Sequence, residues 1–320
     1  MNLSPPLDET FLVTGGAGYV GRQVVGRLVE GGCRNVHVLD SLASGARRLS
    51  QLPLDQVTVH VCDLTDRHAV ERVANAVRPT CVIHLAAIHF IPACEADPGW
   101  AAAVNVTGTV NILKATPLGA TFVFASTAAV YAPEDVAHEE GRSPTRPMDV
   151  YGLTKLHGED YVAHFHRTGA LNGVIVRLFN IVGPGETNPH LAPAIIRQLA
   201  DGNRQVDLGN LFPKRDYLDV SDAAEGFLRL SRLPRGDAPT ICNLGSGQAH
   251  SVEAMVRAIG AAAGVELDIR QDPARVRAVD RPMLLASTDR LQELTNWRPV
   301  RTLDVSMRDA WGSRDADRLA

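Results

Sequence analysis

The chain has 320 residues, of which 45% are hydrophobic and 21% charged, and its formal net charge at pH 7 is −4. This composition is ordinary for a globular protein with its own core, and without a basic surplus no nucleic-acid partner is expected. No apolar run approaches the roughly 20 residues of a membrane span, and the opening MNLSPPLDET lacks the regions of a signal peptide. We therefore expect a cytoplasmic protein with no membrane partner.

Alternating patterns from residue 11 onward predict the fold. Apolar runs rich in Val, Ile and Phe predict buried strands at 11–15, 36–40, 57–63, 81–87, 121–126 and 173–180. Apolar residues spaced three and four apart predict helices between them, at 19–31, 66–77, 98–116 and 150–168. Strands that are apolar on both faces and alternate with helices predict an α/β fold, a doubly wound parallel sheet of the Rossmann type.

The composition of the chain changes after residue 180, where Gly and Pro become frequent. Helical patterns follow at 191–201, 221–232 and 251–264, and the terminal SRDADRLA is expected to be frayed or weakly helical. We expect a dinucleotide-binding domain over 1–180, with a return segment at about 217–247. The remainder of 181–320 is expected to form a smaller, discontinuous α/β lobe that binds substrate.

Five cysteines, at positions 33, 62, 81, 94 and 242, are scattered without a CxxC pair. An odd, dispersed set indicates a reducing compartment and argues against a metal site. We expect each cysteine to be a small buried apolar residue.

The stretch FLVTGGAGYVG at 11–21 places glycines between a predicted strand and a predicted helix. Gly16, Gly18 and Gly21 fit the dinucleotide fingerprint, in which the first glycine makes the turn, the second admits a pyrophosphate and the third lets helix pack on strand. Asp40 ends the next strand, where its carboxylate can accept from both ribose hydroxyls and would repel a 2′-phosphate. The pattern therefore favours NAD over NADP.

Two neighbouring features leave alternatives open. Arg47 and Arg48 could soften the exclusion of NADP, although we interpret them as solvated helix residues. Asp63 and Leu64 could contact the adenine, whereas the competing interpretation makes Asp63 or Thr65 the N-cap of the next helix.

YGLTK places Tyr151 and Lys155 four apart, on one face of a helix. An ammonium beside a phenol favours the phenolate and lowers its pKa, which produces a base that works near neutral pH. In the competing interpretation, Lys155 pairs with Glu159 and Tyr151 packs in the core. Ser126 and Thr127 end a predicted strand where ligands of α/β sheets collect, so a hydroxyl there could contact substrate and Tyr151.

Several motifs occur in the order typical of the extended short-chain dehydrogenase/reductases. They are TGGAGYVG, Asp40, HLAA at 84–87, Asn105 within VNVTGT, Thr127, YGLTK, RLFNIVGP at 177–184 and RDYLDV at 215–220. Over about 10–305 the chain resembles this family, and more narrowly its sugar-nucleotide epimerase/dehydratase group. Segments 208–220 and 272–299 resemble the GDP-mannose dehydratase and reductase branch, which points to GDP as the nucleotide.

The resemblance implies a catalytic trio of Thr127, Tyr151 and Lys155. It implies cofactor contacts by Gly15, Gly18, Tyr19, Val20, Asp40, Asp63, Leu64, Leu85, Ala86, Ala87, Asn105, Tyr151 and Lys155. It implies nucleotide-sugar contacts by His89, Thr127, Asn180, His190, Leu191, Arg215, Arg277 and Asp280. His89 stands where 4-epimerases have a cofactor-binding lysine, a departure from the pattern.

The resemblance leaves three reactions in competition. Dehydratases place an acid pair after the catalytic Thr, and Ala128 and Ala129 stand there instead, so dehydration is disfavoured. We favour a 4-epimerase acting on a GDP- or UDP-hexose, in which Tyr151 takes the 4-hydroxyl proton while hydride passes to bound NAD. The alternative is an NAD(P)H-dependent 4-keto-6-deoxyhexose reductase, although Asp40 argues against NADPH. Thr187 stands where glucuronate epimerases have a loop arginine, which disfavours a uronic acid.

Two further expectations concern assembly and the absence of activity. In the family, the helices that correspond to 98–116 and 149–168 form a four-helix bundle across a two-fold axis. The resemblance therefore implies a homodimer, with Val104, Val110 and Ile112 contributing apolar surface. A non-enzymatic NAD-binding sensor is the other class considered, and it predicts that Tyr151→Phe changes nothing measurable.

Overall fold

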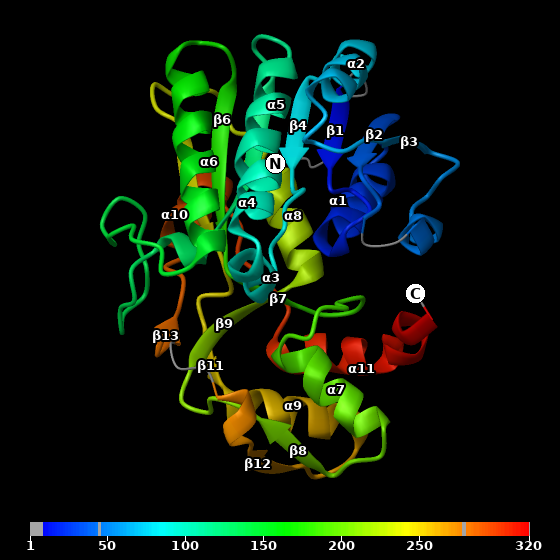
Figure 1. Cartoon of the computed structure of the whole chain (residues 1–320), viewed down its shortest axis with the longest axis vertical. Helices are drawn as coiled ribbons and strands as arrows, with labels where there is room; N and C mark the ends of the chain where they lie inside the picture. Colours follow the sequence, from blue (N-terminus) through cyan, green and yellow to red (C-terminus); the bar gives the residue numbers. More distant parts are fainter. Residues whose placement is uncertain (1–8, 44–45, 277–279, 320) are drawn as a thin grey trace.

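The computed structural model of the chain describes residues 9–43, 46–276 and 280–319. Figure 1 shows two parts, a large layered α/β unit and a smaller lobe below it, with a cleft lined by residues of both parts. Within the described ranges, no helix is both long and apolar enough to cross a membrane. The five cysteines are free and buried, as expected.

A seven-stranded parallel sheet forms the centre of the large unit, in the order β10-β6-β5-β4-β1-β2-β3. Its strands are β1 (Thr10–Thr14), β2 (Asn35–Asp40), β3 (Val57–Val61), β4 (Cys81–His84), β5 (Thr121–Thr127), β6 (Asn172–Leu178) and β10 (Thr240–Leu244). This sheet and its flanking helices confirm the predicted Rossmann-type fold. The apolar runs predict six of these strands but not β10, which joins the edge of the sheet from far along the chain.

Helices cover both faces of the sheet and bury a separate core against each. One face carries α1 (Tyr19–Glu30), α8 (Val220–Leu230) and α10 (Asp289–Thr295). The other carries α2 (Arg67–Val77), α5 (Gly108–Ala115) and α6 (Val150–Arg167). Ile112 of α5 is fully buried in this second core. It therefore cannot supply the subunit surface expected of it, because the sheet already covers its side chain.

The helix expected over 98–116 is interrupted. It consists of α4 (Pro98–Ala102), a π-helical turn η2 (Ala103–Thr107) and α5, and α3 (Ile91–Ala96) precedes it. A π-turn holds one extra residue per turn and often occurs at a functional site. Here it turns Asn105 inward, where the side chain is 1% exposed.

The smaller lobe has its own apolar core. α7 (Leu191–Ala200), α9 (Val252–Ala263) and α11 (Leu303–Leu319) pack around a pair of parallel strands, β8 (Gln205–Leu208) and β12 (Asp268–Gln271). A second small sheet joins β11 (Ala249–Ser251), β9 (Lys214–Asp219) and β13 (Met283–Leu284), with β7 (Asn180–Val182) paired to β9. The terminal segment, expected to be frayed or weakly helical, forms the end of α11.

Candidate functional site

A cleft of about 1430 Å³ runs along the carboxyl ends of the parallel strands and between them and the lobe. Its walls include the glycine loop, the ends of β2, β4 and β5, the start of α6, and the segments 180–197 and 207–217. Ligands of open α/β sheets bind at this edge. The cleft brings together most of the residues that the sequence analysis selected.

Gly15 makes the tight turn of the glycine loop. Its φ is +68°, and a Cβ there would lie 2.7 Å from the Ala86 nitrogen. The prediction that Gly16 makes this turn was wrong, because Gly16 faces the Val38 side chain behind the loop. A Cβ on Gly21 would meet the Gly15 carbonyl at 2.1 Å, so the glycines at 15, 18 and 21 form the functional spacing. The loop presents bare backbone at the start of α1, which fits a dinucleotide pyrophosphate.

Asp40 ends β2 and lines the cleft. Its two carboxylate oxygens accept from the Ala17 nitrogen at 3.1 Å and the Leu42 nitrogen at 2.8 Å. The charge is thereby fixed beside the glycine loop, where it disfavours a second anionic group such as a 2′-phosphate. The side chains of Arg47 and Arg48 lie outside the described residues.

Asp63 and Leu64 both line the cleft after β3. Asp63 accepts from the nitrogen and the hydroxyl of Thr65, both at 2.8 Å. The competing interpretation of Asp63 or Thr65 as a helix N-cap was wrong, because Asp66 caps α2 by accepting from the Ala69 nitrogen at 3.0 Å.

Asn105 lies behind the cleft wall rather than in it. Its amide donates to the Ile88 carbonyl at 2.9 Å and accepts from the Ile88 nitrogen at 2.8 Å, and it also donates to the Thr154 hydroxyl at 3.0 Å. Thr154 in turn donates to the Tyr151 carbonyl at 2.8 Å. Asn105 thereby supports two segments that line the cleft, 85–88 and the start of α6, and its contact with the cofactor stays a prediction.

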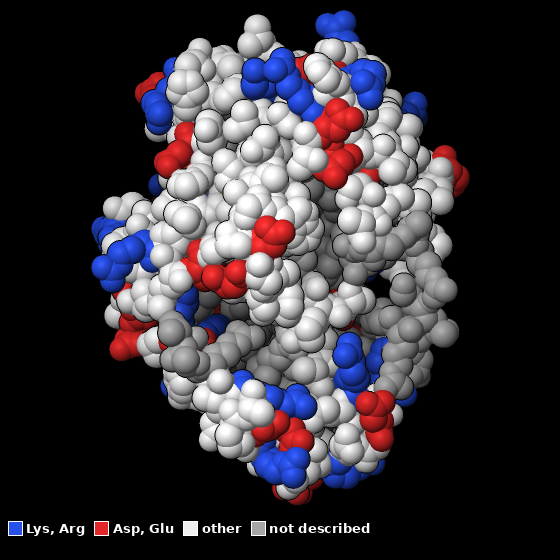
Figure 2. Space-filling view, viewed as in Figure 1, with Lys and Arg blue, Asp and Glu red and all other residues white. Residues whose placement is uncertain are grey.

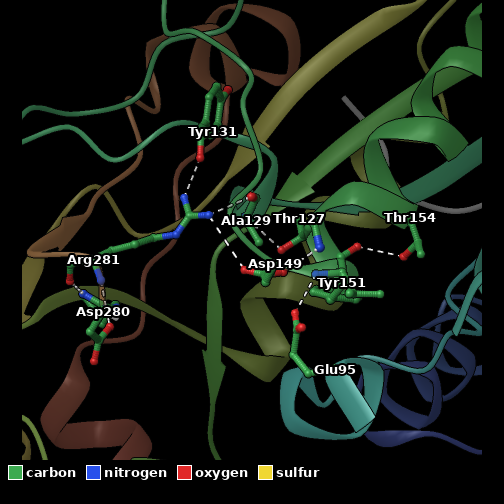
Figure 3. Close-up of polar contacts among 12 residues, drawn as sticks. Glu95, Thr127, Ala129, Tyr131, Asp149, Tyr151, Thr154, Asp280 and Arg281 are labelled. Carbon is green, nitrogen blue, oxygen red and sulfur yellow. Dashed lines mark hydrogen bonds and ion pairs between the residues drawn. The ribbon is translucent and has the colours of Figure 1, made fainter. Parts of the chain in front are cut away.

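The predicted catalytic trio meets at the end of β5 and the start of α6. Asp149 caps α6 by accepting from the Gly152 nitrogen at 2.7 Å, which sets the direction of the turn that carries Tyr151 (Figure 3). The side chains of Tyr151 and Thr127 lie next to each other in the wall of the cleft. Lys155 is 2% exposed, with Nζ 4.8 Å from the centroid of the Phe124 ring.

Burial shifts the pKa values of Tyr151 and Lys155 in the protein without cofactor. It raises the pKa of Tyr151, against a lowering by the Thr127 hydrogen bond, and it lowers the pKa of Lys155 to about 7. The prediction that the lysine lowers the phenol pKa therefore does not hold for the protein alone, because loss of hydration has the largest effect and the Cys94 and Asp149 groups also raise this pKa. Positive charge brought by a bound cofactor would act in the predicted direction.

Glu159 does not pair with Lys155. Arg177 donates to its two oxygens at 2.9 and 2.7 Å, and Ser126 donates at 2.5 Å. The guanidinium also lies over the Tyr131 ring at 4.8 Å. The competing interpretation of Lys155 as the partner of Glu159 was therefore wrong, and this buried cluster fixes β5 directly before Thr127.

His89 faces a loop of the lobe across the cleft. Its Nε2 accepts from the Asn188 amide at 2.9 Å, and the same amide donates to Glu186 at 3.2 Å. His190 lies beside it, with the two ring centroids 6.5 Å apart. Burial lowers the pKa of His89, with Glu186 acting in the opposite direction. A neutral imidazole thus stands where the related lysine would be charged.

The far end of the cleft holds an ion pair between Arg215 and Asp280. Arg215 donates to Asp280 at 2.5 Å, and both line the cleft with Asn180, whose amide donates to the Asp216 carbonyl at 3.2 Å. Arg277 lies outside the described residues. Arg281, which the sequence analysis did not select, also lines the cleft, and its contacts join distant segments that no local pattern could have indicated.

A sequence model of the NAD dependent epimerase/dehydratase family matches residues 11–245. The chain belongs to this family. Membership confirms the resemblance drawn from the motifs, the assignment as an NAD-dependent enzyme, and NAD as its cofactor. The glycine loop and Asp40 fit that cofactor, because they offer bare backbone to its pyrophosphate and a carboxylate beside it.

Relatives of this epimerase/dehydratase family member cover nearly its whole length. A UDP-glucose 4-epimerase of Streptomyces lividans is 33% identical, covering 95% of this chain and 96% of its own. A GDP-6-deoxy-D-mannose reductase of Pseudomonas aeruginosa is 30% identical, covering 96% and 99%. The crystal structure of Thermus thermophilus UDP-glucose 4-epimerase with NAD is similar at a TM-score of 0.83, with 31% identity over 95% of this chain and 98% of that one.

Proposed function

We propose that the protein is an NAD-dependent nucleotide-sugar 4-epimerase acting on a GDP- or UDP-hexose. One observation carries the proposal: the side chains of Thr127 and Tyr151 lie next to each other in the same cleft wall as the glycine loop, and only small residues, Ala128 and Ala129, follow Thr127. This arrangement suits proton transfer at a hydroxyl. It lacks the acid pair that elimination of water would use.

Each member of the trio has a role in the proposed reaction. Tyr151 takes the proton from the sugar 4-hydroxyl and returns it at the end of the cycle. Thr127, whose hydroxyl lies next to the phenol, donates to the substrate oxygen. Lys155, buried beneath the site, orients cofactor and phenol. Bound NAD would accept the hydride from the sugar and return it to the other face of the ketone after the ketone has rotated. No cofactor is then consumed.

The remaining contacts follow the walls of the cleft. We propose that the cofactor lies along the glycine loop, Asp40, Asp63 and the segment 85–87. We propose that the sugar lies against His89 and the diphosphate against Asn180 and Arg215. We propose that His190 and Leu191 close over the nucleotide, with Asp280 near it. On this basis the cofactor is bound by residues 1–180 together with the return segment at about 217–247. The substrate is bound by the rest of 181–320.

The second candidate is an NAD(P)H-dependent nucleotide-4-keto-6-deoxyhexose reductase. The nearly full-length similarity to a GDP-6-deoxy-D-mannose reductase favours it. The carboxylate of Asp40 beside the glycine loop opposes NADPH, and a reductase would have to exchange its cofactor after each turnover. A sensor without turnover is disfavoured because Thr127, Tyr151 and Lys155 are all present in the cleft wall.

We further propose a cytoplasmic homodimer formed through α4 and α6. Trp100 of α4 is 45% exposed, and Leu153 and Tyr161 of α6 are 46% and 41% exposed. Figure 2 shows a broad, mostly uncharged area in the upper centre of this face, over α4 and α5. Large apolar side chains gathered on adjacent helices favour contact with a second copy.

The first test is to unfold the purified protein and analyse the released small molecules by mass spectrometry. Stoichiometric NAD, followed by epimerisation of a GDP- or UDP-hexose, supports the proposal. Tyr151→Phe is expected to keep NAD and lose turnover by about 10²–10⁴-fold, the usual contribution of a general base. Protein that releases no NAD, and that reduces a 4-keto sugar with added NADPH, would instead assign the reductase.

A further inference from the structure

Arg281 lies shortly before β13 in the chain, lines the cleft and is 8% exposed. Its guanidinium donates to the Tyr131 carbonyl at 2.5 Å and to the Ala129 carbonyl at 2.9 Å (Figure 3). The nearest carboxylate oxygen of Asp149 is 3.9 Å away. A buried guanidinium that faces three oxygens holds in place the three segments that carry these oxygens. If any one segment moved, the buried charge of Arg281 would be poorly paired.

Two of those oxygens, the carbonyls of Ala129 and Tyr131, belong to the turn that follows Thr127. Ala129 accepts from Arg281 through its carbonyl, and its nitrogen donates to Thr127 Oγ1 at 3.1 Å. A Cβ on Gly152 would lie 2.6 Å from the same Ala129 carbonyl, so the first turn of α6 rests directly on this peptide. Arg281 therefore supports the Thr127 turn and, through it, the helix turn that carries Tyr151.

Asp149 extends this support to the start of α6. Its carboxylate caps the helix at the Gly152 nitrogen while facing the guanidinium of Arg281. Burial raises the pKa of Asp149, and the hydrogen bond from Gly152 and the charge of Arg281 act in the opposite direction. Arg281 therefore partly neutralises a carboxylate whose charge raises the pKa of Tyr151.

The backbone of Arg281 lies at the end of the cleft that holds Arg215 and Asp280. Its carbonyl accepts from Arg215 at 2.8 Å, and its nitrogen donates to Asp280 at 2.9 Å. Asp280 also accepts from Arg215 at 2.5 Å. One residue thus contacts the proposed diphosphate site through its main chain and the catalytic turn through its side chain.

We propose that Arg281 is a positioning residue that couples the diphosphate end of the cleft to the catalytic turn. It acts through Ala129 and Asp149, and a diphosphate held by Arg215 fixes the main chain from which its side chain extends. This inference rests on the proposed function for the identity of the substrate. The contacts of Arg281 themselves do not depend on it.

The kinetic test compares Arg281→Gln and Arg281→Lys with Arg215→Gln. We expect Arg281→Gln to lower kcat about 100-fold with KM changed less than about threefold, because a small misplacement of reacting groups has this effect. Arg281→Lys restores the charge and should recover part of kcat. Arg215→Gln should mainly raise KM, because a guanidinium that binds a diphosphate contributes to substrate affinity.

Arg235→Gln is the matched control. Arg235 donates to the His166 carbonyl at 2.6 Å and lies outside the cleft, so its loss should leave kcat and KM unchanged. A shift of KM in Arg281→Gln that equals the shift in Arg215→Gln would overturn the proposal, as would an unchanged kcat. Thermal unfolding of each variant separates misfolding from mispositioning, and Arg281→Lys serves if Arg281→Gln does not fold.

A second readout does not need turnover. The ionisation of Tyr151 in the NAD-loaded protein can be followed by ultraviolet absorbance, with the signal of Tyr151→Phe subtracted. The groups that face this phenol are Thr127 of β5, Cys94 of α3 and Asp149 at the N-cap of α6. Lys155 lies on the same face of α6 as Tyr151.

Arg281→Gln removes the cation beside Asp149, so we expect Tyr151 to titrate about half a pH unit or more higher. An unchanged midpoint would count against the proposal. If the wild type epimerises no nucleotide hexose, the proposed function fails, while this titration still decides the role of Arg281.

Discussion

Gly15 and Ala86 are in direct backbone contact across the floor of the cofactor cradle. A Cβ on Gly15 would lie 2.7 Å from the nitrogen and 2.8 Å from the Cα of Ala86, and φ of Gly15 is +68°. The end of β1 and the segment after β4 can approach this closely only because Gly15 has no side chain.

Gly15→Ala should therefore abolish NAD retention. The left-handed conformation costs an alanine about 1–2 kcal/mol, and the Ala86 backbone must move away from the cradle as well. The measurement is NAD released on denaturation, per mole of protein. Gly26→Ala is the control on the same helix that follows the loop, because nothing lies within 4 Å of its added Cβ. It should keep NAD and stabilise the protein by about 0.5–1 kcal/mol. Stoichiometric NAD in Gly15→Ala would show that the cradle lies elsewhere.

Asp40→Asn tests whether charge selects the cofactor. The variant keeps the size of the side chain but removes the anion held by the nitrogens of Ala17 and Leu42. Hydrogen bonds to charged groups are worth about 1.5–3 kcal/mol, so NAD affinity should fall about tenfold or more while NADP affinity rises. Calorimetric titration of cofactor-free protein measures both. Asp55→Asn, at an exposed position outside the cleft, controls for net charge. An unaltered ratio of the two affinities would remove Asp40 as the selector.

Because Lys155 is buried, we predict that its contribution makes the free energy of unfolding depend on pH. Burial lowers its pKa to about 7 in the folded cofactor-free protein, whereas an unfolded chain holds the proton to about 10.5. Between these pH values the unfolded state binds more protons, so this residue makes the free energy of unfolding rise with pH. Each unit of pKa difference corresponds to about 1.4 kcal/mol.

Lys155→Met removes this rise. We expect the variant to exceed the wild type in stability near pH 7 and to lose that advantage as the pH approaches 10, measured by urea unfolding without cofactor. Lys114→Met, which removes an exposed lysine of α5, controls for the lost charge. Parallel curves for Lys155→Met and the wild type would mean that Lys155 stays protonated in the folded state.

Tyr161→Glu tests the proposed subunit surface. Tyr161 is 41% exposed on α6, and a carboxylate buried there without a partner would oppose association. Sedimentation at micromolar concentration should show a dimer for the wild type and a monomer for the variant. Leu54→Glu places the same charge at a 52% exposed leucine before β3 and should remain dimeric. A monomeric wild type would refute the homodimer itself.

The sequence by itself determined the features that depend on near neighbours. Alternating apolar strands and amphipathic helices predicted the parallel sheet, because burial on both faces leaves that periodicity in the chain. The glycine cluster, Asp40 and the pair Tyr151 and Lys155 were predicted from spacing, because each acts at a fixed offset from a strand end or along one helix face.

Tertiary structure alone decided which side chains meet across long separations. Glu159 takes Arg177 rather than Lys155, because both charges are buried and Arg177 can donate to two carboxylate oxygens at once. Asn105 lies in a π-turn that interrupts a helix which the apolar spacing predicted as continuous, and its amide donates to the Ile88 carbonyl from 17 residues away. Arg281 contacts Tyr131 from 150 residues away, which no local pattern encodes, because folding chooses such a partner by shape and unmet hydrogen bonds rather than by sequence spacing.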